Sequence, residues 1–207
     1  MKKLLLLVAV LTFTVGSALA QGFQFGAKVG GNFSNVVGGG DYTKYNKGKI
    51  GFNVGATVDY GFNEKMFLFS GLELTTKGFK IDESFAKLTA NAMYLQLPIH
   101  FAYKIAVGSG PVKLVPEAGL YVAYGIGGKV KTELFGEEEK DDYFGDPKKG
   151  YCKAFDLGVG AAFGAEFGKI GVKVGYDYGL LNMVDDEDDS KYKNMNSNVY
   201  LSVGYKF

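Results

Sequence analysis

The chain has 207 residues, with 23 basic against 22 acidic side chains and a formal net charge of +1. This balance gives no electrostatic footprint for nucleic acid, and the length fits a single domain. Cys152 is the one cysteine, which excludes an intrachain disulfide and any metal site built on several cysteines.

Residues 1–20 have the composition of a cleaved signal peptide. Two lysines precede an apolar run from Leu4 to Val15, and Ala18-Leu19-Ala20 is a small-x-small cleavage site. The sequence therefore predicts an exported mature domain over residues 21–207. That domain has no run of 18 predominantly apolar residues, so no transmembrane helix is expected. A closed β-barrel is the other structure that satisfies every backbone polar group inside a bilayer.

The segment from 199 to 207 shows a strict period of two. Its odd positions are apolar or aromatic and its even positions are small or polar, which is typical of a strand between two different environments. Similar alternation predicts eight strands, at 22–34, 48–61, 65–80, 91–105, 111–131, 151–167, 169–182 and 196–207. Short connections alternate with long polar ones, at 35–47, 81–90, 132–150 and 183–195. Outer-membrane barrels show this alternation of short turns and long loops.

The two faces of the predicted strands differ in size as well as polarity. One carries large apolar and aromatic residues, and the other carries glycine, alanine and scattered charges. The interior of an eight-stranded barrel is only just wide enough for side chains, so the small, charged face fits inside. We therefore predict an all-β, eight-stranded antiparallel up-and-down barrel in the outer membrane of a Gram-negative bacterium, with an apolar exterior against lipid. The alternative is a soluble, lipocalin-like barrel with the faces reversed.

Several short motifs resemble the PorT-like family of outer-membrane β-barrel proteins over essentially the whole mature length. They begin at Gly26, Gly71, Tyr94, Asp156 and Tyr176, and read GAKVGGNFS, GLEL, YLQLPI, DLGVG and YDYGLLNM. The resemblance implies a membrane barrel. A named member of that family implies a part in a secretion and surface-modification apparatus. The family usually carries an acidic residue at the position of Gln96.

The predicted lumen holds most of the residues that could carry chemistry. His100, the single histidine, lies on an inward face, but the sequence gives no serine that a hydrolase could pair with it. The inward charges are predicted to pair with one another, because buried charges persist only when paired. They are Lys28, Asp59, Glu73, Lys77, Lys104, Lys113, Glu117, Lys129, Asp156, Glu166, Lys173, Asp177 and Lys206.

Two acidic runs, at 137–142 and 185–189, fall in predicted loops. Carboxylates can bind hard divalent cations, but a solvated charge run is the simpler interpretation. No catalytic, cofactor-binding or metal-binding residue is assigned. The leading hypothesis is a non-enzymatic membrane protein that contacts outer-membrane lipid and binds envelope or surface proteins through loops 35–47, 81–90, 132–150 and 183–195. The alternatives are a narrow channel for ions or small solutes, and a lipid-modifying enzyme that depends on His100.

Overall fold

The computed structural model describes residues 22–38, 45–83, 86–146, 151–184 and 193–207. Its strands are β1 (Phe23–Gly38), β2 (Lys47–Gly61), β3 (Met66–Asp82), β4 (Ala86–Tyr103), β5 (Ile105–Ala106), β6 (Val112–Leu134), β7 (Glu137–Asp142), β8 (Phe155–Phe167), β9 (Ile170–Gly179) and β10 (Asn194–Lys206). Within these ranges no helix is long and apolar enough to cross a membrane. The predicted signal peptide and the acidic run 185–189 lie outside the described residues.

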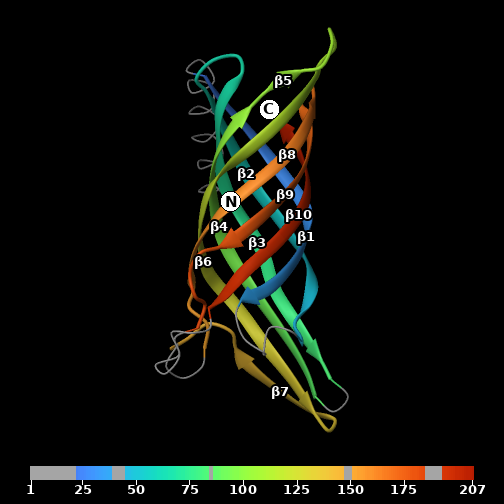
Figure 1. Ribbon diagram of the computed structural model, residues 1–207, viewed down its shortest axis with the longest axis vertical. Coiled ribbons are helices and arrows are strands. Elements are labelled where there is room, and N and C mark those ends of the chain that lie inside the picture. Colours follow the sequence, from blue (N-terminus) through green and yellow to red (C-terminus); the bar gives the residue numbers. More distant parts are fainter. Residues whose placement is uncertain (1–21, 39–44, 84–85, 147–150, 185–192) are drawn as a thin grey trace, which may run out of the picture.

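Eight of the strands form a closed antiparallel ring (Figure 1). Pairing runs β1–β2–β3–β4–β6–β8–β9–β10, and β10 returns to pair with β1 from Gly26↔Lys206 to Gly38↔Asn194. The two short strands β5 and β7 each pair with β6. The predicted all-β, antiparallel barrel is confirmed, and each strand of the ring meets one of the eight predicted segments.

The barrel has two different ends. At the turn end, short connections join β2 to β3, β4 to β6 through β5, and β8 to β9, and the chain finishes with the Phe207 amide donating to the Phe25 carbonyl at 2.9 Å. At the loop end lie the other connections and the β6–β7 hairpin. Figure 1 shows the turn end, with β5 and the C-terminus, at the top and β7 at the bottom.

Two predicted loops contain much more strand than expected. A loop is predicted at 132–150, but β6 continues to Leu134 and β7 occupies Glu137–Asp142. Another loop is predicted at 81–90, but β3 continues to Asp82 and β4 begins at Ala86. These strands extend beyond the barrel wall, because β4 and β6 stay paired as far as Ala86↔Leu134. Conversely, β8 begins only at Phe155, later than the predicted start at residue 151.

The predicted orientation of the two strand faces is confirmed. Large apolar side chains point away from the axis and are exposed, Val29 by 60% and Leu201 by 57% of their surfaces, whereas inward Glu73 and Asp177 are 4% and 3% exposed. A contiguous apolar exterior of this extent is unstable in water and fits a hydrocarbon environment.

Two of the predicted inward charges are wrong. Lys113 lies beside the turn at 107–111 and is exposed, so it is not part of the buried lumen. Lys129 is exposed because β6 carries an extra residue: Met93 pairs with Gly127 but Tyr94 pairs with Gly125, which leaves Ile126 unmatched. Such a bulge reverses the parity of the residues that follow it. The remaining residues of the predicted set are buried or half-buried.

Candidate functional site

The lumen is filled by side chains in successive layers, starting with a group of charges at the turn end. Lys206 contacts both Glu166, at 2.6 Å, and Asp59. Lys104 lies 3.4 Å from Glu166 and places its ammonium 3.7 Å from the centre of the Phe67 ring. Asp59, Glu166 and Lys206 come from β2, β8 and β10, and Lys104 comes from the connection between β4 and β5, so their contacts join separate parts of the barrel wall.

The middle layer contains His100. Its Nδ1 lies 3.1 Å from Glu117 Oε1. The other carboxylate oxygen, Oε2, forms an ion pair with the Lys173 ammonium, with 2.7 Å between Oε2 and Nζ. A separate pair joins Lys28 to Glu73 at 2.5 Å. His100 is 1% exposed. In the described part of the chain its hydrogen-bond partner is this carboxylate, and no serine is placed beside it.

The third layer is organised by Asp156. Its Oδ2 accepts hydrogen bonds from the Tyr121 hydroxyl at 3.0 Å and the Asn196 amide at 2.8 Å, and lies 3.5 Å from the Lys77 ammonium. That ammonium also lies over the Tyr121 ring, 4.4 Å from its centre. Oδ2 of Asp156 thus has partners from β3, β6 and β10, which offset the cost of burying this polar group.

Glycines on neighbouring strands make room for the large side chains of these layers. A Cβ atom on Gly160 would stand 2.7 Å from Asp177 Oδ1 and 2.8 Å from His100 Nε2. At Gly158 a Cβ atom would enter the Tyr121 ring. The glycine-rich inward face is therefore required by the aromatic and charged residues that it opposes.

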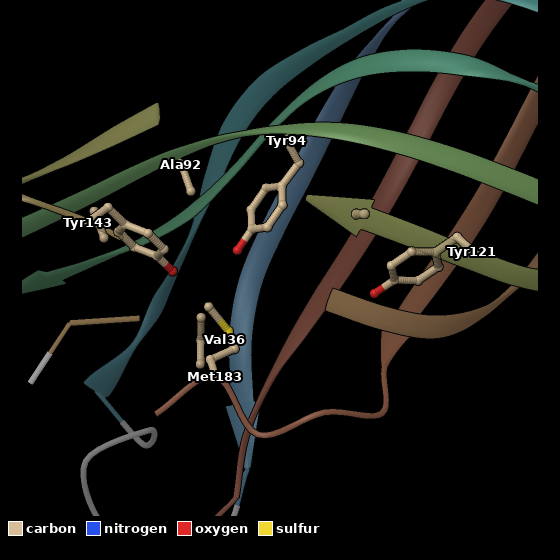
Figure 2. Packing of buried hydrophobic residues seen from close by; sticks show 8 residues of the cluster. Val36, Ala92, Tyr94, Tyr121, Tyr143 and Met183 are labelled. Atoms are coloured by element: carbon tan, nitrogen blue, oxygen red, sulfur yellow. The ribbon is translucent and has the colours of Figure 1, made fainter. Parts of the chain in front are cut away.

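An apolar cap covers the charged layers at the loop end. Its buried members are Val36, Ala90, Ala92, Tyr94, Tyr121, Ala123, Tyr143 and Met183. Figure 2 shows the hydroxyl ends of Tyr94 and Tyr143 converging above Val36 and Met183. Two of these residues, Tyr143 and Met183, come from irregular segments. No period-two pattern marks such segments, so their role could not be predicted from the alternation of residues.

Two cavities lie inside the barrel, one toward each of its ends. One of about 70 Å³ at the turn end is lined by the first two charged layers and by Ser202, and one of about 160 Å³ at the loop end is lined mainly by apolar residues, including Val36 and Phe79. Tyr94 and Tyr121, each 0% exposed, line neither cavity. Along β4, Tyr94 lies between Ala102 of the turn-end cavity and Ala90 of the cap, and along β6, Tyr121 follows Glu117 of that cavity. The two buried rings therefore fill the lumen between the cavities.

Cys152 and Tyr143 lie beside each other at the loop end, outside the strands of the ring. The Cys152 amide donates to the Tyr143 carbonyl at 2.9 Å. Burial raises the pKa of the Cys152 thiol, although a hydrogen bond with Tyr143 lowers it in part. Burial also raises the pKa of the Tyr143 hydroxyl well above its ordinary value. Both groups are therefore neutral at physiological pH and suit an apolar cap.

The β6–β7 hairpin presents a second candidate site outside the barrel wall. On one face, Lys131 pairs with Glu133 at 2.8 Å and Glu138 at 2.7 Å, and these carboxylates raise the pKa of Lys131 to about 12. At the tip, Phe135 adopts a φ of 51° and is 88% exposed. The acidic run 137–142, which is predicted as part of a loop, forms strand β7. Among the described residues, no cluster of His, Cys, Asp or Glu is placed to hold a metal ion.

The sequence matches a family model described as an outer membrane protein beta-barrel domain, over residues 19–185. The chain therefore belongs to this family of outer-membrane β-barrel proteins. No curated protein matched the sequence.

Solved structures with a similar fold include Ail, the attachment invasion locus protein of Yersinia pestis, with 18% identity, 89% of this chain and 98% of that chain covered, and a TM-score of 0.46. Neisserial surface protein A has 15% identity, coverage of 88% and 97%, and a TM-score of 0.43. The outer membrane protein OprG from Pseudomonas aeruginosa has 13% identity, coverage of 90% and 97%, and a TM-score of 0.41. At these values the family assignment rests on the family model.

Proposed function

We propose that this outer-membrane protein is a non-conducting barrel that acts through its loop end, by binding envelope or surface proteins. The observation that carries the proposal is the layer at Tyr94 and Tyr121, which are 0% exposed and separate the two cavities. Eight strands leave room for little more than side chains, and here aromatic rings and paired charges occupy that room.

In this arrangement the turn end lies in the periplasm and the loop end at the cell surface, residues 1–20 are removed as a signal peptide, and residues 21–207 form the mature barrel. Short periplasmic turns and longer external connections are the usual arrangement in this class. The resemblance to PorT-like proteins supports a role in a secretion or surface-modification apparatus. In that role the barrel would be an anchor and the β6–β7 hairpin a contact surface.

A narrow channel is the second candidate. The observation that favours it is the charged cavity at the turn end, where Glu117 and Lys173 line an opening of about 70 Å³. A cavity of this size holds a few water molecules. To conduct, the path would still have to pass the layer at Tyr94 and Tyr121, which are 0% exposed.

Planar-bilayer recordings of the purified protein separate the two candidates. We expect no reproducible stepwise current from the wild type, and a current from a Tyr94→Ala/Tyr121→Ala double variant, because the double substitution removes the closing layer. Tyr124→Ala is the matched control, since Tyr124 lies on β6 like Tyr121 but faces outward and is 59% exposed. Reproducible wild-type conductance that shifts when Glu117 or Lys173 is changed would establish the channel instead.

A further inference from the structure

We propose that the outer edge of β7 docks an extended, lysine- or arginine-rich segment of a partner protein, which adds to the sheet as a further strand. This inference rests on the proposed function at the loop end and names the chemistry of the partner. It is carried by an open main-chain edge, by the distribution of charge on the two faces of β7, and by the conformation of the hairpin tip.

The main-chain edge arises from the unequal lengths of the strands. Beyond Tyr124, where its pairing with β8 ends, β6 keeps β4 on one side and takes β7 on the other. The outer side of β7 pairs with no other strand in the described part of the chain. In an antiparallel ladder alternate residues direct their N–H and C=O groups away from the neighbouring strand. Half of the residues of Glu137–Asp142 therefore offer donors and acceptors to an incoming strand.

Charge is distributed unevenly over the two faces of this hairpin. On one face, Lys129 pairs with Asp142 at 2.6 Å, and Glu138 pairs with Lys131 at 2.7 Å and with Lys140 at 2.9 Å. On the other face, Glu137, Glu139 and Asp141 stand opposite Leu134, Thr132 and Val130, which carry no charge. All three of these carboxylates are exposed, and the ion pairs of the hairpin among the described residues involve other side chains. We call them the acidic row.

The negative charge of the acidic row determines which kind of segment can pair with the edge of β7. A second copy of β7 would bring carboxylates against carboxylates, and like charges directly opposite each other in a sheet are destabilising. A segment with a basic residue at every second position would place each one toward the acidic row, because side chains alternate along a strand. The same residues thus oppose self-association and favour a basic partner.

The tip of the hairpin adds an apolar contact at one end of this edge. Phe135 and Gly136 have φ values of 51° and 91°, a backbone conformation that Asn-Gly adopts with less strain than Phe-Gly. The ring of Phe135 is 88% exposed. Strained residues held in this way cluster at binding sites, and an exposed aromatic beside a docking edge gives an incoming strand a surface to pack against.

The experiment uses the full-length protein in lipid nanodiscs and an eight-residue peptide of alternating lysine and threonine, with binding measured by fluorescence anisotropy at low and physiological salt. We expect binding that weakens with salt. Neutralising the acidic row, by Glu137→Gln, Glu139→Gln and Asp141→Asn together, should weaken it about tenfold, as three exposed ion pairs would. The matched control neutralises the other face, by Glu133→Gln, Glu138→Gln and Asp142→Asn, and should retain most of the affinity.

Strand addition is tested separately with N-methylated peptides. Methyl groups on alternate amides of one edge of the peptide should abolish binding, whereas methyl groups on the opposite set of amides should leave it intact. Absence of binding to the unmethylated peptide, equal losses in the two triple variants, or no difference between the methylated peptides would each overturn the inference. Dimerisation of the wild type that strengthens in the acidic-row variant would assign the edge to a second copy and also overturn it. A barrel that fails these tests and still conducts no current leaves the closed-barrel proposal standing.

Discussion

Lys77 and Asp156 form an ion pair across the lumen, with Nζ and Oδ2 3.5 Å apart and side chains that are 1% and 3% exposed. They belong to β3 and β8, which are not neighbours in the sheet. The pair therefore joins two walls of the barrel directly beneath the apolar cap. Because both groups are buried, each depends on the other for compensation of its charge.

Removing the charge of Asp156 alone should destabilise the barrel strongly. In an Asp156→Asn variant the Lys77 ammonium remains buried without its carboxylate, and breaking such a pair typically costs about 3–5 kcal/mol. A Lys77→Met/Asp156→Asn double variant should regain much of that loss, because neither charge is then left alone. Urea unfolding in lipid vesicles measures the free energy of unfolding for each protein. Lys129→Gln is the control and should leave it unchanged, since the Lys129–Asp142 pair is exposed. Equal stability of the single variant and the wild type would contradict the pairing.

Gly160 should not tolerate a side chain. A Cβ atom there would approach Asp177 Oδ1 to 2.7 Å and His100 Nε2 to 2.8 Å, so Gly160→Ala forces both side chains to move. Overpacking of this kind costs about 1–3 kcal/mol. Gly127→Ala is the matched control, because a Cβ atom at Gly127 meets nothing within 4 Å. The urea midpoints of the two variants make the comparison, and equal midpoints would show that the lumen beside His100 is not closely packed.

Cys152 should react slowly with iodoacetamide at pH 8. The thiolate is the nucleophile, and because burial raises the pKa of this thiol, a smaller fraction is ionised at any given pH than for an exposed cysteine. Its reaction rate should therefore rise at a higher pH. Ser109→Cys in a Cys152→Ser background supplies an exposed reference, since Ser109 lies in the turn at 107–111. Reaction of the two thiols at the same rate across pH 7–10 would show that the loop-end cap does not bury Cys152.

Much of this architecture could be predicted from the sequence because alternation reports which side of a strand faces lipid. The alternation in 199–207 and in the other segments gave the faces correctly, including inward Tyr94 and Tyr121. It could not give the partner of a lumen charge, since parity carries no information on height or on distant strands. The Lys77–Asp156 pair depends on both.

Other features escaped prediction for local reasons. The residues of β7 have low strand propensity and no apolar alternation, so they form a strand only because the free side of β6 accepts them. Lys129 was assigned to the lumen because one bulge residue, Ile126, cannot be recognised in a strand that is otherwise regular. The side chain of Tyr143 enters the cap from outside any periodic segment.

The central claim, a lumen closed at Tyr94 and Tyr121, is tested most directly by the sidedness of a thiol placed beneath them. Ser202 lines the turn-end cavity and is 3% exposed, so Ser202→Cys in a Cys152→Ser background is a conservative probe. A small, membrane-impermeant thiol reagent is added to one side at a time of bilayers in which the barrel is oriented, with the denatured protein giving the total thiol. We predict labelling from the turn-end side, and labelling from the loop-end side only after Tyr94→Ala and Tyr121→Ala are introduced. Equal labelling from both sides without those substitutions would contradict the account.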